Sequence, residues 1–223
     1  MPTEDDFQRW LDDGIVPPYK DIDMPRPLDA LFNRRSQRYT DLSTPNALQD
    51  ALDRFRMRDR VIARFGFAVP CQEAVDALRA LSPLVEVGAG TGYWSALLSK
   101  AGADIIATDL LPQGTPTYYG FTVGTHCPIV QASGEDAVRA HPERNVLMVW
   151  PSLGETWAAQ AVAAMQPGRV LALVAEGSDG ATGDETLFER LASDFEEIGF
   201  IPLPQWENMH DDLTLYRKLT PSE

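Results

Sequence analysis

With 223 residues, 44% of them hydrophobic, the chain has the length and composition of one globular domain with a single core. Its net charge of −14 is uneven, because residues 71–223 carry 8 Lys and Arg against 21 Asp and Glu, whereas residues 1–70 carry 11 against 12. An acidic surface repels phosphate backbones, which argues against a DNA or RNA substrate and favours a small molecule, with cationic ones among the candidates.

The sequence predicts a cytoplasmic protein without a membrane partner. It contains no run of eighteen apolar residues, and its first residues lack the basic and apolar regions of a secretory signal. Cys71 and Cys127 have no C-x-x-C spacing, so reduced thiols are the simplest interpretation. No metal-ligand spacing occurs, and the sequence does not indicate the oligomeric state.

The N-terminal third divides into two segments. Prolines at 17, 18, 25 and 27 exclude a long helix from residues 1–43, which we expect to form an irregular arm with at most a short helix at Phe7–Leu11. Ser43-Thr44-Pro45 is a typical helix start, and apolar residues then recur with helical spacing up to about Gly66. The arginines of this helix, between Arg54 and Arg64, are interpreted as its solvated face.

Strands and helices alternate from residue 71 onward. We expect helices at 71–81, 93–101, 156–165 and 185–195, and strands at 84–87, 104–108, 128–131, 146–150, 170–175, 200–203 and 213–217. Such alternation predicts a parallel α/β sheet covered on both faces. The last two strands have no helix between them and should form an antiparallel hairpin at one edge.

A glycine loop follows the first predicted strand. Val85–Gly92 reads V-E-V-G-A-G-T-G, in which Gly88, Gly90 and Gly92 follow a strand and precede a helix. Glycines allow positive φ and close approach of a ligand, and the backbone N–H groups then face that ligand. The spacing is G-x-G-x-G, not the G-x-G-x-x-G of dinucleotide sites, which disfavours a nicotinamide oxidoreductase.

This loop resembles motif I of the class I S-adenosylmethionine (SAM)-dependent methyltransferases, in which an acid, here Glu86, precedes G-x-G-x-G by one residue. From Phe67 to Lys218 the chain looks like small bacterial members of that family. The resemblance implies a Rossmann-like class I methyltransferase fold, with a seven-stranded, mostly parallel sheet and an antiparallel terminal hairpin, and SAM as cofactor. It further implies a SAM-binding domain over residues 44–223, in which residues 44–70 fold over the cofactor.

The resemblance also assigns cofactor-binding roles. Asp109, at the tip of the second strand, matches the acid that holds both ribose hydroxyls, while Glu135 or Asp136, after the third strand, would bind the adenine amine. Of these two, Glu135 is slightly favoured. The full predicted cofactor set is Glu86, Gly88, Ala89, Gly90, Gly92, Asp109, Glu135, Asp136 and Trp150.

Three residues are predicted to take part in the chemistry. Trp150 and Tyr93 could place a ring face against the sulfonium, which is attracted by about 0.5–2 kcal/mol, although either could instead be packing. Glu176 could orient a substrate amine or act as a base, although it could equally be a solvated acid of the glycine-rich loop that follows it. His210 could also reach the cleft.

The fourth strand ends in Trp150-Pro151, where many amino-methylating members carry D/N-P-P-Y/F. That substrate class is therefore not carried over. The leading hypothesis is a methyltransferase that acts on a small molecule. One alternative is an enzyme that breaks the bond between sulfur and the aminocarboxypropyl arm of SAM, by cyclisation or alkyl-arm transfer, and releases methylthioadenosine. Another is a SAM-binding protein without catalysis.

Overall fold

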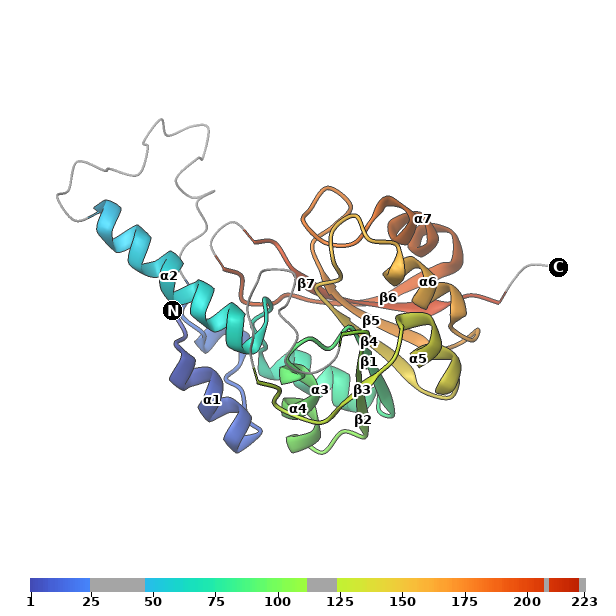
Figure 1. Cartoon of the computed structure of the whole chain (residues 1–223), viewed down its shortest axis with the longest axis horizontal. Helices are drawn as coiled ribbons and strands as arrows, with labels where there is room; N and C mark the ends of the chain where they lie inside the picture. The colour runs from blue at the N-terminus through green and yellow to red at the C-terminus, as the bar shows by residue number, and fades with distance from the viewer. Residues whose placement is uncertain (25–46, 112–123, 207–208, 221–223) are drawn as a thin grey trace.

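The computed structural model describes residues 1–24, 47–111, 124–206 and 209–220, so the expected helix start at Ser43-Thr44-Pro45 lies outside the described residues. A seven-stranded sheet has the order β3-β2-β1-β4-β5-β7-β6 (Figure 1). Its strands are β1 (Leu84–Val87), β2 (Ile105–Asp109), β3 (Ile129–Gln131), β4 (Asn145–Val149), β5 (Val170–Ala175), β6 (Phe195–Ile201) and β7 (Asp212–Lys218). Strands β1 to β5 pair in parallel, and β7 runs antiparallel to both β5 and β6. The predicted fold class is confirmed.

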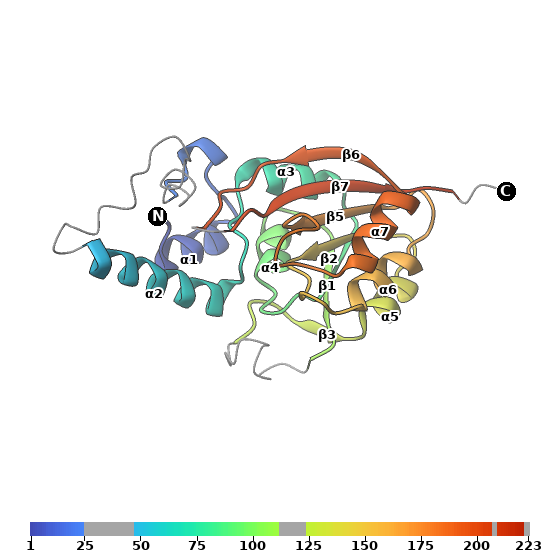
Figure 2. The same ribbon diagram turned by 90° about the horizontal axis from the view of Figure 1, so that it is seen from above.

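Helices cover both faces of the sheet (Figures 1 and 2). One face packs against α1 (Glu4–Asp13), α3 (Gln72–Ala80) and α4 (Tyr93–Lys100), and the other against α5 (Gly134–Ala140), α6 (Trp157–Ala164) and α7 (Glu185–Asp194). Because successive side chains of a strand point to opposite faces, Leu84 and Leu147 belong to the first core and Val85 and Val146 to the second. The carboxyl ends of the five parallel strands consequently share one edge.

Helix α1 is longer than the segment Phe7–Leu11 expected within the N-terminal arm. Thr3 and Asp6 form a reciprocal capping box at its start, and Gly14 ends it with a φ of 68°. Its buried residues, Phe7, Trp10 and Leu11, join the core beside α4. The prolines at 17 and 18 follow the helix and so do not prevent it from forming.

Helix α2 (Ala47–Phe65) joins the domain by its C-terminal turns, while its N-terminal part projects away from the sheet (Figures 1 and 2). Val61 and Phe65 are fully buried in the first core. Arg60 forms an exposed ion pair with Glu4 of α1, as expected for a solvated basic face. No described helix is both long and apolar enough to cross a membrane.

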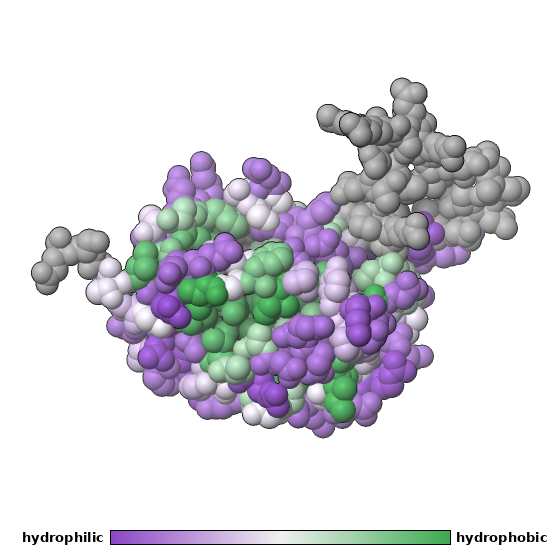
Figure 3. Space-filling model, turned by 180° about the vertical axis from the view of Figure 1, so that it is seen from behind, coloured by the Kyte–Doolittle hydropathy of each residue, from purple (hydrophilic) through white to green (hydrophobic). Residues whose placement is uncertain are grey.

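The terminal hairpin departs from the prediction in one respect. Strand β6 begins at Phe195, directly after α7, and not at Phe200, so the predicted bounds of 200–203 were wrong. A register shift between Glu197 and Gly199 and the charges of this edge strand hide the alternation that marks a strand. Phe200, on this edge strand, stays 56% exposed. On the rear face of the molecule, hydrophobic residues lie in the middle and hydrophilic ones surround them (Figure 3).

Candidate active site

The glycine loop between β1 and α4 has the geometry that its sequence predicts. Gly88, Gly90 and Gly92 all have positive φ, of 72°, 55° and 70°. A Cβ atom would lie 2.8 Å from the Trp157 ring at Gly88 and 2.8 Å from the Cys127 sulfur at Gly92, but would meet nothing within 4 Å at Gly90. Two of the glycines are therefore required by packing, whereas Gly90 borders open space where a ligand could approach.

Asp109 ends β2 beside this loop. Its Oδ2 accepts a hydrogen bond of 2.8 Å from the Gly90 N–H, and its Oδ1 accepts one of 2.9 Å from the Leu111 N–H. The N–H of Ala89 donates to the Thr108 carbonyl at 2.9 Å, which fixes the loop on β2. The structure thus brings the loop and the acid together, and each Asp109 oxygen still has a lone pair for another donor.

Glu86 lies underneath the loop and not on its surface. It is 2% exposed, and its Oε2 accepts hydrogen bonds from the Ser95 hydroxyl and, at 3.0 Å, from the Ser95 N–H. Burial raises the pKa of Glu86 to about 7, and the charge of Asp109 adds to this effect. Glu86 connects β1 to the first turn of α4, and so supports the loop from below.

The two candidate adenine ligands lie in the first turn of α5. Ser133 caps the helix by accepting a hydrogen bond from the Asp136 N–H at 3.1 Å, and its hydroxyl donates to the Asp136 carboxylate at 2.7 Å. Glu135 pairs with Arg139 one turn later, at 2.5 Å, in an exposed ion pair. The Asp136 carboxylate is thus occupied by the cap, whereas Glu135 is held only by a surface contact.

Tyr93 lies in the hydrophobic core, although it directly follows the glycine loop. It is 1% exposed, packs against Phe7, Phe65 and His126, and donates a hydrogen bond of 3.2 Å to the Phe7 carbonyl. Burial raises the pKa of its hydroxyl far above the usual range. The geometry connects Tyr93 to α1, and a ligand would need to displace this packing to contact its ring.

Trp150 follows β4 at the carboxyl edge of the sheet. It is the one non-glycine residue with positive φ, 53°, in the part of the chain that the structure describes. Its ring stacks on Phe67, with ring centroids 4.6 Å apart and planes 17° apart. A bulky residue in this conformation is strained, and such strain occurs most often at functional sites.

Glu176 follows β5 at the same edge and is 7% exposed. Its Oε2 accepts a hydrogen bond of 2.6 Å from the Ala181 N–H, and its Oε1 accepts one of 2.8 Å from the His210 N–H. The Thr182 hydroxyl also bonds to the backbone of Glu176. Glu176 thereby holds the glycine-rich loop and the start of β7 together, and it is not a solvated loop acid.

Asp211 was missed by the sequence analysis. It precedes β7 and is 1% exposed, and neither of its carboxylate oxygens has a hydrogen-bond partner. Its pKa is raised to about 7, mostly by burial and in smaller part by the charges of Asp212 and Glu176. The sequence offers no signal for this residue, because His210-Asp211-Asp212 has the composition of an ordinary polar turn.

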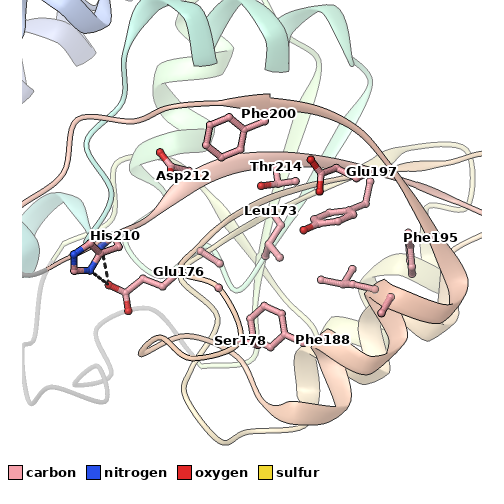
Figure 4. Close-up of a pocket in the computed structure, with 15 residues that line it drawn as sticks. Leu173, Glu176, Ser178, Phe188, Phe195, Glu197, Phe200, His210, Asp212 and Thr214 are labelled. Carbon is pink, nitrogen blue, oxygen red and sulfur yellow. Dashed lines mark hydrogen bonds and ion pairs between the residues drawn. The ribbon is translucent and has the colours of Figure 1, made fainter.

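A groove of about 550 Å³ runs from Glu176 and His210 between α7 and the β6–β7 hairpin (Figure 4). Leu173, Phe188 and Phe200 supply much of its apolar lining, and His210 lies at its rim. Among the described residues, no cluster of His, Cys, Asp and Glu has the geometry of a metal site.

No protein-family model and no curated protein sequence matches the chain. Solved structures resemble it weakly. One of them concerns the conversion of a disulfide bond into a thioacetal group during echinomycin biosynthesis. It is 16% identical to this chain over 71% of this chain and 85% of its own, with a TM-score of 0.46. The Burkholderia thailandensis 1,6-didemethyltoxoflavin-N1-methyltransferase, solved with 1,6-didemethyltoxoflavin and S-adenosylhomocysteine, is 17% identical over 90% and 93%, with a TM-score of 0.43.

A third such structure, the glycopeptide N-methyltransferase MtfA complexed with S-adenosylhomocysteine, is 14% identical over 67% of this chain and 89% of its own, with a TM-score of 0.42. The strand order and the glycine loop described above define an α/β domain with one mixed seven-stranded sheet, in which the glycine loop and Asp109 lie at the carboxyl edge of the parallel strands.

Proposed function

We propose that this chain is a SAM-dependent methyltransferase that acts on a small molecule. The observation that carries the proposal is the junction of Asp109 with Gly90, because it joins the acid expected for the ribose to the one loop glycine that borders open space. SAM supplies an activated methyl group bound to a positively charged sulfur.

The residues at this edge fit such a cofactor. The free lone pairs of Asp109 would accept the two ribose hydroxyls. Glu135 is better suited than Asp136 to the adenine amine, because an exposed ion pair costs little to exchange, whereas the Asp136 carboxylate belongs to a helix cap. The glycine loop would receive the rest of the cofactor on its N–H groups.

The chemistry would take place above β4 and β5, where Trp150 and Glu176 lie. Methyl transfer is an in-line displacement that depends mainly on the positioning of acceptor and sulfonium, so an explicit base is optional. The Trp150 ring would attract the sulfonium, and Glu176 would keep the surrounding loops in place. The excess of acidic residues in this domain supports a small, non-nucleic-acid acceptor.

The test is mass spectrometry of the nucleosides formed when the pure protein is incubated with SAM, alone and with a metabolite extract. S-adenosylhomocysteine that appears only with extract is the expected result, and a labelled methyl group would then identify the acceptor. Methylthioadenosine would contradict methyl transfer and indicate cleavage of the aminocarboxypropyl arm. SAM binding with neither product would indicate a protein without catalysis.

A further inference from the structure

A buried carboxylate at the substrate side of the site lacks any partner. Asp211 is 1% exposed, both of its oxygens are without a hydrogen bond, and no described lysine or arginine forms an ion pair with it. A carboxylate removed from water without a partner is costly, so such a group either holds a proton or receives a charged partner from outside the chain.

The groups around Asp211 make the local potential negative. Glu176 and Asp212 both raise the pKa of Asp211 through their charges, and burial raises it most, to about 7. His210, the nearby residue that could carry a positive charge, is turned toward Glu176, with 3.8 Å between its Nδ1 and the Oε1 of Glu176. A positively charged ligand would relieve this repulsion, and an anionic one would increase it.

Trp150, whose ring stacks on Phe67, lies near the carboxylate. The Trp150 N–H lies near Asp211 and favours its ionised form. The two groups do not reach hydrogen-bonding geometry, so each is left without a partner. Trp150 and Phe67 stack on each other, and both are only half-buried. The Phe67 carbonyl accepts a 2.8 Å hydrogen bond from the Trp206 indole N–H, which fixes the backbone that carries the Phe67 ring.

We propose that Asp211, beside the Trp150–Phe67 pair, binds the positively charged nitrogen of the acceptor substrate, an ammonium group or a protonated heterocycle. The carboxylate provides the counter-charge and the aromatic faces attract the cation. The inference rests on the proposed function, since it names the substrate class of the same site. The nitrogen that is recognised need not be the atom that is methylated.

The first experiment separates this inference from the proposed function. A metabolite extract is divided at pH 7 by cation exchange, and each fraction is incubated with the protein and SAM. We expect S-adenosylhomocysteine to form with the retained, cationic fraction. Its formation only with the unretained fraction would overturn the role of Asp211 and leave methyl transfer intact. Its absence with every fraction would overturn both.

The second experiment uses Asp211→Asn, which keeps the shape of the side chain and removes its charge. With the retained fraction, kcat/KM should fall about tenfold or more, whereas the affinity for SAM, measured by calorimetry, should stay unchanged. Asp179→Asn, which removes an exposed charge from the neighbouring loop, serves as the matched control and should leave both unchanged. Weaker SAM binding in Asp211→Asn alone would instead place the amino group of SAM at this carboxylate.

A third measurement does not depend on any variant folding. The Asp211 carboxyl carbon is titrated by NMR in the wild-type protein, without ligand and with benzylammonium, ethylammonium or neutral benzyl alcohol. The ammonium probes should lower the titration midpoint by about 1 pH unit or more, because a bound cation favours the ionised form. Benzyl alcohol should leave it in place. An unchanged midpoint with both ammonium probes would overturn the proposal.

Discussion

The two halves of the carboxyl edge satisfy their polar groups in different ways. Around β1 and β2 the buried and loop carboxylates have partners within the chain: Asp109 accepts from Gly90 and Leu111, and Glu86 accepts from Ser95. Around β4, β5 and β7 the Asp211 carboxylate does not, and it is buried without a partner, as is the Trp150 N–H. Under the proposed function, the first half would bind the cofactor, and the second would bind the acceptor. Substitutions in the two halves should therefore have different consequences.

The largest effect is expected for Asp109→Ala. The loss of two charge-assisted hydrogen bonds to ribose hydroxyls, and of the support for Gly90, should lower SAM affinity on the order of 100-fold or more. Calorimetry of the purified variant measures this, with Asp179→Ala as an exposed carboxylate control. Wild-type affinity in Asp109→Ala would refute the ribose assignment and remove the basis for treating this half as the cofactor half.

Asp211→Asn should change stability in a pH-dependent way. The folded-state pKa of Asp211, about 7, lies above its ordinary value of 3.8, so the folded protein binds more protons between these values and wild-type stability falls as the pH rises through this window. The variant does not titrate and should be more stable than wild type at pH 8, by on the order of 2–4 kcal/mol, with no such gain at pH 4.

Urea unfolding at the two pH values measures this difference. Asp179→Asn should follow the wild-type curve. A gain for Asp211→Asn that is equal at both pH values would mean that the pKa of Asp211 is not raised in the folded protein, and the contrast between the two halves would lose its electrostatic basis.

Two glycines of one loop should respond differently to alanine. Gly88→Ala places a Cβ 2.8 Å from the Trp157 ring, and should lower the free energy of unfolding by about 2–3 kcal/mol through overpacking and strain. Gly90→Ala meets no atom and should cost only about 1 kcal/mol for its positive φ, while it obstructs the cofactor. Thermal unfolding and SAM calorimetry of both variants test this, and equal SAM affinity in Gly90→Ala and wild type would contradict the ligand-facing position.

Trp150 should give the smallest effect. Trp150→Ala removes the ring near the reacting centre and should lower turnover by roughly 2- to 30-fold, the equivalent of about 0.5–2 kcal/mol, with little change in SAM affinity. Trp150→Phe keeps an aromatic face and should retain most of the activity. Unchanged turnover in Trp150→Ala would limit the residue to packing against Phe67.

The sequence by itself determined the class of fold and the position of the glycine loop. Both depend on local properties: the alternation of buried strands with helices, and the backbone freedom that glycine alone has at positive φ. Strand β1 and helices α3 and α4 lie where the pattern predicts. The start of β6 was not predictable, because a bulge and edge charges erase its periodicity.

The tertiary structure alone decided which polar residues keep a partner and which do not. Tyr93 follows the glycine loop, yet α1 covers it, and Glu86 has the sequence of a ligand-binding acid, yet Ser95 occupies it. Asp211 comes beside Glu176 and Trp150 only because β7 inserts antiparallel next to β5, with Ala175 opposite Asp212. The burial and the electrostatic environment of a side chain depend on which chain segments pack together across the sheet. The local sequence around a residue does not show which distant segment will pack against it, so these properties could not be predicted.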